Sequence, residues 1–287
     1  MQHIAVQPPA DVPKNKIETY IKNYNAVTQN SKRLFLFACD QKVEHLNADF
    51  YGDKIHPDAH QVSHIFEIAR QGRIGALATH LGLIARYAKQ YPTINYIAKL
   101  NGSSHLAKTE DPYSKLLWHV QDVIAIQEQH TIPIRGIGYT LYLGSTYEPE
   151  MLSEAAHLVS QAHQHGLLAI LWVYARGKNI SNETDPKLLA GAAGIAASLG
   201  ADFVKIKAPN AINDLLMITA AAGNCGVICS GGSMQEPNQF LKNLSDQIHI
   251  GNASGCATGR NIFQKSLPEA VAFTHAIATI VFDNQQL

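Results

Sequence analysis

The chain has 287 residues, of which 46% are hydrophobic and 16% are charged, so we expect a large core and a lightly charged surface. Its 23 basic and 23 acidic residues balance, which argues against the basic stripe of a nucleic-acid-binding protein and the patch of a membrane-surface protein. The cysteines (Cys39, Cys225, Cys229 and Cys256) form no CxxC pair, a pattern typical of reduced thiols in a cytoplasmic protein. The sequence shows no signal-peptide core and no apolar run long enough to span a membrane. We therefore expect a cytoplasmic protein with neither a nucleic-acid partner nor a membrane partner.

Short apolar runs alternate with helix-length segments along nearly the whole chain. In chain order, strands are expected at residues 34–40, 74–80, 95–101, 134–140, 168–174, 202–208, 226–231 and 247–251. The helices between them are clearest at 148–166, which has a helical apolar face, and at 185–200, which begins with Asp-Pro and ends with Gly. This alternation predicts an α/β fold, a single-domain (β/α)8 TIM barrel over residues 31–287, with residues 1–30 as an N-terminal extension that packs on it. A doubly wound open sheet is the alternative, but the first strand is not followed by a GxGxxG turn.

Two lysines interrupt the apolar run "ADFVKIKA" of the expected sixth strand. Because side chains alternate along a strand, Lys205 and Lys207 are expected to share one face, the inner one. A lysine in a barrel mouth can attack a carbonyl as a free amine when burial and a neighbouring ammonium group lower its pKa. The alternative is that one of the two lysines extends to a salt bridge at the rim. The sequence leaves both alternatives open.

Other polar residues stand where expected strands end, which is the end of such barrels that carries the chemistry. Asp40 could orient a hydroxyl or accept a proton, or it could simply cap a turn. Tyr174 could transfer protons, whereas Trp172 on the same strand face could serve packing alone. Glu44 and His45 follow Asp40 and are expected only to support the site. The fourteen histidines show no HxH or HExxH spacing, so no metal site is predicted.

Two glycine-rich turns near the C-terminus predict a phosphate site. The segment "CSGGSM" contains Gly231 and Gly232, and "ASGCATGRNIFQ" leads through Gly259 to a helix expected to begin near Arg260. Backbone amides, the positive end of a helix dipole and a guanidinium group all favour a dianion. Barrels of this class frequently bind phosphate after strands seven and eight.

Four segments resemble, in the same order, those of the archaeal-type class I fructose-bisphosphate aldolases, a family of Schiff-base TIM-barrel enzymes with bacterial relatives. The segment "DQKVEH" resembles the DQGxEH segment of the family, and "LWVYARGK" resembles its W-x-Y-P-R-G segment. The segment "ADFVKIK" resembles the ADxxKxK strand, and "ATGRNIFQ" resembles the GRNI(W/F)Q loop. The resemblance covers residues from about 30 to 265.

The resemblance implies that Lys207 forms the imine, that Tyr174 transfers protons and that Asp40 holds substrate hydroxyls. The binding residues expected around them are Lys205, Trp172, Arg176, Gly231, Gly232, Gly259 and Arg260. The implied reaction is the reversible cleavage of fructose 1,6-bisphosphate to dihydroxyacetone phosphate and glyceraldehyde 3-phosphate, a step of glycolysis and gluconeogenesis. It uses a covalent lysine imine, with no cofactor and no metal. The expected partner is a phosphorylated sugar, and by family analogy the chain forms a homo-oligomer, such as a decamer.

The chain departs from the family pattern at four places. Lys42 replaces a glycine, Ala175 replaces a proline, "APN" at 208–210 replaces Tyr-Thr-Gly, and Ser233 and Met234 replace Pro-Lys. These changes touch sugar and phosphate contacts more than the catalytic set. Three alternatives therefore remain: a Schiff-base lyase or transaldolase for another sugar phosphate, a zinc-dependent aldolase, and a non-catalytic barrel that binds a phosphorylated metabolite.

Overall fold

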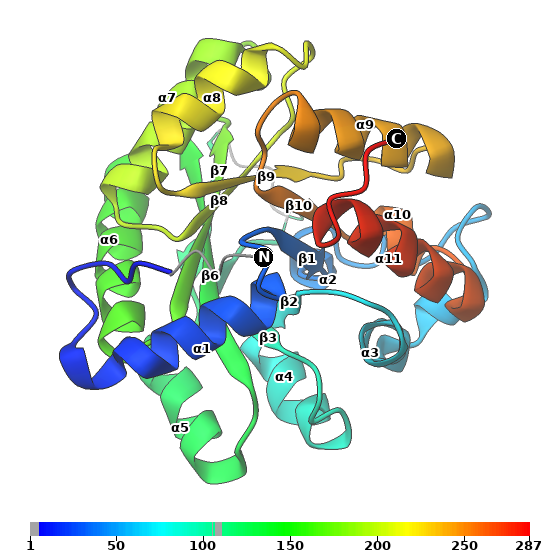
Figure 1. Ribbon diagram of the computed structural model, residues 1–287, viewed down its shortest axis with the longest axis horizontal. Helices are drawn as coiled ribbons and strands as arrows, with labels where there is room; N and C mark the ends of the chain where they lie inside the picture. Colours follow the sequence, from blue (N-terminus) through cyan, green and yellow to red (C-terminus); the bar gives the residue numbers. More distant parts are fainter. Residues whose placement is uncertain (1–5, 105, 107–110) are drawn as a thin grey trace.

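A closed barrel of parallel strands forms the centre of the computed structural model, which describes residues 6–104, 106 and 111–287 (Figure 1). Within these residues, eight strands close the barrel in the order β1-β10-β9-β8-β7-β6-β3-β2. They are β1 (Leu34–Ala38), β2 (Ala76–His80), β3 (Tyr96–Lys99), β6 (Ile134–Leu143), β7 (Leu168–Ala175), β8 (Phe203–Ile206), β9 (Gly226–Ser230) and β10 (Gly255–Thr258). Two short strands, β4 (Asn101–Gly102) and β5 (Lys115–Leu116), pair antiparallel outside the barrel. The predicted fold class is confirmed.

Helices surround the barrel (Figure 1). In chain order they are α1 (Ile17–Thr28), α2 (Gln41–Glu44), α3 (Val62–Gln71), α4 (Leu81–Tyr87), α5 (Val120–His130), α6 (Glu148–Gln164), α7 (Pro186–Ser198), α8 (Asp214–Ala222), α9 (Pro237–His249), α10 (Arg260–Phe263) and α11 (Leu267–Val281), with 3-10 turns at Lys14–Lys16, Pro57–His60 and Ala88–Gln90. Strand side chains alternate between two apolar clusters. On β8, Val204 and Ile206 pack in the larger cluster with residues of the surrounding helices, whereas Phe203 packs in the cluster inside the barrel.

The strand expected at residues 247–251 is wrong. Helix α9 runs through the first part of that segment, and Phe240, Leu244 and Ile248 recur every four residues on its buried face. The eighth barrel strand is instead β10, Gly255–Thr258, inside a segment expected to be a loop. Its glycine and alanine have little intrinsic preference for strands, so pairing with β1 and β9 is what makes this segment a strand.

The segment before β1 covers the N-terminal end of the barrel. Helix α1 lies across this end (Figure 1), where Asn23 donates a hydrogen bond of 2.8 Å to the Gly166 carbonyl and Tyr20 donates one to Asp202. Residues 1–5 of the predicted extension lie outside the described residues, and the domain boundary at residue 30 stays a prediction. With α1 at this end, the loops that carry polar residues gather at the opposite, C-terminal end of the strands.

Candidate active site

Trp172 and Lys205 lie next to each other inside the barrel. They are Cα partners on β7 and β8, and the Lys205 Nζ atom lies 5.3 Å from the centre of the indole ring. Gly138 on β6 makes room for this ring, because a Cβ atom there would lie 2.4 Å from it. Lys205 is 5% exposed, and burial lowers the pKa of its ammonium group. The barrel interior therefore holds a lysine that loses its proton more readily than usual.

Lys207 does not share this position, which corrects the expectation that both lysines occupy the inner face. Strand β8 ends at Ile206, so strand alternation no longer fixes the direction of the next side chain. The Lys207 ammonium group donates a hydrogen bond to Glu183, in the loop before α7, and 36% of the lysine side chain is exposed. Lys207 also lines a rim cavity of about 590 Å³. The rim salt bridge, which the sequence left open as an alternative, is what the structure shows for Lys207.

A third lysine, Lys99 at the end of β3, is fully buried beside the same indole. Its Nζ atom lies 5.7 Å from the centre of the Trp172 ring. It donates hydrogen bonds to the Asn101 side chain at 2.7 Å and to the Asn101 carbonyl at 2.8 Å. It also lies 4.0 Å from Glu44 Oε1, in an ion pair. Lys99 and Lys205 therefore place two ammonium groups around one ring.

Two carboxylates of the mouth differ in their acidity. Burial alone would raise the pKa of Asp40, but the positive charges of Lys205 and Lys99 outweigh it and lower that pKa. Burial and the nearby charge of Asp40 raise the pKa of Glu44. One carboxyl group thus stays ionised, while the other takes up a proton more readily. Pairs of acids whose environments separate their pKa values are typical of acid–base sites.

Tyr174 lies two residues beyond Trp172 on β7, with its ring 6.2 Å from that of Tyr142. Burial, reinforced by the negative charges of Glu44 and Asp40, raises the pKa of Tyr174 well above its usual value. The phenol therefore keeps its proton at neutral pH and can act as a hydrogen-bond or proton donor.

Several buried polar atoms near this end of the barrel have no hydrogen-bond partner among the described residues. They are Gln41 Oε1, Glu44 Oε1, Ser114 Oγ, Thr140 Oγ1, Trp172 Nε1 and Thr258 Oγ1. An unpaired buried polar atom costs about 1–3 kcal/mol, so such groups in native proteins call for a specific explanation. Two of these atoms, on Glu44 and Trp172, belong to side chains beside the buried lysines and are candidates to bind a polar ligand.

At the rim, one carboxylate holds two cations. Glu183 accepts hydrogen bonds of 2.8 and 3.1 Å from Arg176, and it also accepts the bond from Lys207. Burial would raise the pKa of Glu183, but the bonds from these two cations lower it. The Arg176 guanidinium carbon also lies 5.7 Å from the centre of the Tyr174 ring. The rim cations therefore adjoin the site, although their charge is partly neutralised.

The two glycine turns expected to bind phosphate lie against each other. Gly231 and Gly232 follow β9, and Gly259 precedes α10, which begins at Arg260 as predicted. Asn261 joins the turns, because its side-chain amide donates to the Gly231 carbonyl at 3.0 Å and to the Ser233 carbonyl at 3.1 Å. Phosphate binding by these turns stays a prediction.

Two side chains near these turns have contacts that the sequence does not reveal. Arg260 lies 3.6 Å from Asp49, which also pairs with His45 at 2.6 Å. Lys42, at the position of the family glycine, lies with its Nζ atom 3.7 Å from the centre of the Phe50 ring.

Sequence reasoning missed Lys99, Glu183 and Asn261. Lys99 carries a signal that could have found it, a lone lysine in the apolar run "NYIAKLN". Nothing local marks Glu183 or Asn261, because their partners are brought to them only by folding.

Two further classes of site are missing from the described part of the chain. No three histidine, cysteine, aspartate or glutamate side chains there are placed to hold a metal ion. Likewise, no helix among these residues combines the length and the apolar character needed to cross a membrane.

Comparisons with known proteins agree with this geometry. A family model described as "DeoC/LacD family aldolase" matches residues 34–265. A protein of Methanocaldococcus jannaschii named fructose-bisphosphate aldolase/6-deoxy-5-ketofructose 1-phosphate synthase is 48% identical over 285 residues, which cover 98% of this chain and 92% of that protein.

Solved structures extend the similarity to the whole chain. The fructose-bisphosphate aldolase from Slackia heliotrinireducens matches with a TM-score of 0.97 and 49% identity, covering 100% of this chain and 92% of the other. An archaeal fructose-1,6-bisphosphate aldolase, described with its catalytic lysine covalently bound to a carbinolamine intermediate, matches with a TM-score of 0.79 and 28% identity. That match covers 91% of this chain and 98% of the archaeal chain.

Proposed function

Because the chain belongs to the DeoC/LacD family of aldolases, we propose that it is a class I aldolase that reversibly cleaves fructose 1,6-bisphosphate. The products are dihydroxyacetone phosphate and glyceraldehyde 3-phosphate, as in glycolysis and, in reverse, gluconeogenesis. The observation that carries the proposal is a lysine, Lys205, that is 5% exposed inside the barrel, 5.3 Å from the Trp172 ring, with its pKa lowered by burial and the ionised carboxylate of Asp40 acting on it. The names of the similar aldolases support the choice of substrate.

In this proposal Lys205, rather than Lys207, forms the imine. Lys205 is buried beside Trp172, where its neutral amine can attack the C2 ketone of the substrate. Lys207 is partly exposed and paired with Glu183 at the rim, away from the buried position beside Trp172. Lys207 then serves the role expected of a rim cation, which is to attract a phosphate group.

The remaining residues of the site serve the steps that follow. Attack of Lys205 on C2 gives a carbinolamine, and Tyr174 donates a proton to the hydroxyl group that leaves as water. The resulting iminium withdraws electrons, so the C3–C4 bond breaks when the C4 hydroxyl loses its proton. Glyceraldehyde 3-phosphate leaves, C3 of the enamine is protonated, and water releases dihydroxyacetone phosphate and the free lysine. Asp40, which stays ionised, accepts hydrogen bonds from substrate hydroxyls throughout.

Phosphate binding completes the proposal. The turns at Gly231, Gly232, Gly259 and Arg260 are suited to one phosphate, and Arg176 with Lys207 to the other. No metal and no cofactor take part, because the imine supplies the electron sink. A coupled assay with fructose 1,6-bisphosphate in the presence of a chelator tests the proposal. Turnover is expected with and without chelator, whereas loss of activity with chelator would favour a zinc-dependent aldolase.

A second candidate is the synthesis of 6-deoxy-5-ketofructose 1-phosphate, the other activity in the name of the Methanocaldococcus relative. That sugar carries one phosphate, and its C1–C3 half corresponds to the same dihydroxyacetone phosphate enamine. The pairing of Glu183 with both rim cations favours it, since their charge is partly neutralised and less of it is left for a second phosphate. Product analysis with dihydroxyacetone phosphate and either glyceraldehyde 3-phosphate or 2-oxopropanal as acceptor separates the two activities.

The same proposal includes a homo-oligomer in the cytoplasm. Adjoining helices α7 and α8 expose Leu188, Leu216 and Met217, which are 38%, 43% and 45% exposed, and such apolar faces are typical of subunit contacts. The reduced, buried cysteines and a phosphorylated sugar substrate both suit the cytoplasm. Light scattering of the purified protein measures its mass, and a monomer would contradict the oligomer.

A further inference from the structure

Glu44 is a second carboxylate at the C-terminal mouth of the barrel, and none of the proposed reaction steps uses it. It is the last residue of α2, four residues after Asp40, so the two side chains lie on the same side of this single helical turn. The Glu44 side chain is 15% exposed. Its Oε1 atom is fully buried and accepts no hydrogen bond from any described residue. A buried acceptor of this kind is suited to bind a hydroxyl group of a ligand.

Lys99 holds Glu44 at this place. Two protons of its ammonium group are bonded to Asn101, and Glu44 Oε1 lies 4.0 Å from the same Nζ atom. Lys99 and Lys205 lie 5.7 and 5.3 Å from the centre of one indole ring, that of Trp172. Glu44 is therefore held by Lys99 in the same part of the barrel as Lys205, and the charge of Lys205 acts on it.

We propose that Glu44 is the general base that accepts the proton of the substrate C4 hydroxyl when the C3–C4 bond breaks. In this step the C3–C4 electron pair moves to form the enamine, the oxygen–hydrogen pair forms the new carbonyl at C4, and the proton goes to Glu44. Glu44 then returns the proton to C3 of the enamine, which restores its own carboxylate and the iminium. This inference rests on the proposed function, because it needs the imine on Lys205.

The other groups of the mouth are less suited to this step. Tyr174 keeps its proton, because burial and nearby carboxylates raise its pKa, so it is a donor rather than a base. Asp40 is held ionised by Lys205 and Lys99, and its lowered pKa makes it a weak base. Burial and the charge of Asp40 raise the pKa of Glu44 above its usual value, so this carboxylate binds a proton more readily than Asp40 does.

The groups that act electrostatically on Glu44 come from all sides of the mouth. They are Asp40 and His45 next to α2, Lys99 on β3, Tyr142 on β6, Tyr174 on β7 and Lys205 on β8. The carboxylate of Asp40 disfavours ionisation of Glu44, whereas Lys99, Lys205 and His45 favour it, and burial determines the net direction.

The test compares Glu44→Gln, Glu44→Asp and the control Glu128→Gln, which makes the same change at an exposed residue of α5. Cleavage of fructose 1,6-bisphosphate is measured against pH, and imine formation with dihydroxyacetone phosphate is measured by borohydride trapping. Glu44→Gln is expected to lower kcat about a hundredfold or more, the usual effect of losing a general base. The kcat of this variant should also no longer fall at acidic pH. The variant should still trap as much imine as the wild-type enzyme. Glu44→Asp should restore part of the activity, and Glu128→Gln should behave as wild type.

The outcomes separate the inference from the proposed function. A wild-type enzyme that neither cleaves the bisphosphate nor traps an imine would overturn the proposed function and the inference with it. The inference alone would be overturned if the wild-type enzyme is active and the Glu44→Gln variant has the same kcat and the same fall of kcat at acidic pH. Equal loss of trapping and cleavage in both Glu44 variants would also overturn it, because Glu44 would then act on the formation of the imine.

Discussion

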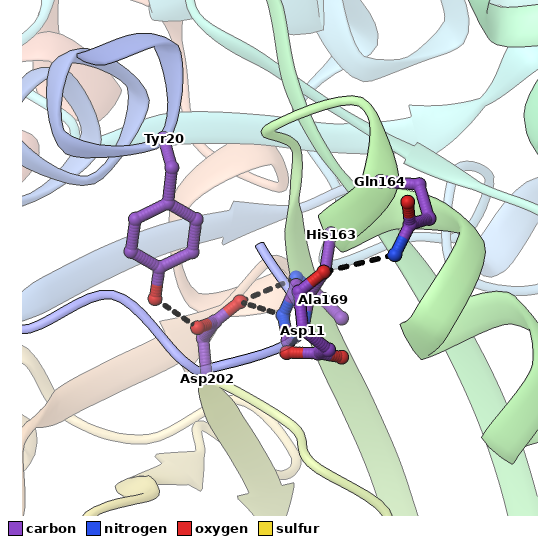
Figure 2. Close-up of polar contacts among 6 residues, drawn as sticks. All are labelled: Asp11, Tyr20, His163, Gln164, Ala169 and Asp202. Carbon is purple, nitrogen blue, oxygen red and sulfur yellow. Dashed lines mark hydrogen bonds and ion pairs between the residues drawn. The ribbon is translucent and has the colours of Figure 1, made fainter. Parts of the chain in front are cut away.

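The two ends of the barrel each hold a buried cluster of charged and polar side chains, and the clusters differ in how completely they are paired. At the N-terminal end, Asp202 accepts hydrogen bonds from Tyr20, from the Ala169 amide at 2.7 Å and from His163 at 3.3 Å (Figure 2). The other nitrogen of the His163 ring lies 2.9 Å from Asp11 (Figure 2). At the C-terminal end, Glu44 and several other polar groups have buried atoms that lack a hydrogen-bond partner among the residues that the structure describes.

This difference in pairing separates a cluster that stabilises the fold from a cluster that is suited to chemistry. The N-terminal cluster joins α1 and the segment before it to α6 and β8, and its groups satisfy one another. The C-terminal cluster leaves acceptors and donors free for a ligand. Cavity size does not separate the two ends, since the groove beside Tyr20 and Asp202 has a volume of about 670 Å³ and the rim cavity beside Lys207 about 590 Å³.

The largest expected effect comes from the buried lysine of the C-terminal cluster. Lys205→Met should remove the amine that forms the imine and lower kcat by several powers of ten, as loss of a covalent nucleophile does. Lys207→Met should keep most of the activity, because its side chain lies at the rim. Single-turnover cleavage of fructose 1,6-bisphosphate measures both. Equal losses in the two variants would remove the distinction between the lysines.

Tyr174 provides the next effect in size. Tyr174→Phe removes the donor that assists loss of water from the carbinolamine, so kcat should fall about a hundredfold. Tyr51→Phe, at an exposed position, serves as the control and should leave kcat unchanged. A Tyr174→Phe enzyme with wild-type kcat would show that another group donates this proton.

The N-terminal cluster should respond in stability rather than in catalysis. Burial would lower the pKa of His163, but its bonds to Asp202 and Asp11 raise it from 6.5 to about 9. The protonated ring therefore stabilises the fold fully below pH 6.5, and this contribution is lost as the pH rises through about 9. A shift of this size corresponds to about 3 kcal/mol.

Urea denaturation of His163→Gln and of the control His157→Gln, exposed on the same helix, checks this expectation. His163→Gln should lower the free energy of unfolding by about 3 kcal/mol at acidic pH and by less above about pH 9. The kcat of the folded enzyme should not change. A loss of stability that is independent of pH would show that the ring acts only through packing.

The smallest expected effect lies at the rim. Lys207→Gln removes one charge-assisted hydrogen bond to a substrate phosphate, so KM for fructose 1,6-bisphosphate should rise about tenfold while kcat changes less. Glu183→Gln should lower KM, because it frees Arg176 and Lys207 from their shared carboxylate. Steady-state kinetics of both variants decides this, and a rise of KM in Glu183→Gln would contradict it.

Much of the fold follows from the sequence, since seven of the expected strands coincide with barrel strands and only the eighth was misplaced. The apolar strands, and the helices that begin with Asp-Pro or end in Gly, can be recognised from their local sequence alone. The strand β10 does not, because its small residues become a strand only between β1 and β9. The recurrence of Phe240, Leu244 and Ile248 every four residues could have revealed that residues 247–249 end an amphipathic helix, but the alternating apolar residues of 247–251 resemble a short strand.

The candidate site was only partly predictable for a related reason. Asp40, Trp172, Tyr174 and Lys205 meet because barrel strands bring their C-terminal ends together, which is a property of the fold class. The direction of Lys207 depends on where β8 ends, and that position is set by pairing with β7 and β9 rather than by local sequence.

Imine trapping tests the central claim most directly. The wild-type protein is incubated with dihydroxyacetone phosphate, reduced with borohydride and digested, and the modified peptide is identified by mass. The expected adduct is on Lys205, with the same yield in Lys207→Met and none in Lys205→Met. An adduct on Lys207 that persists in Lys205→Met would contradict the account.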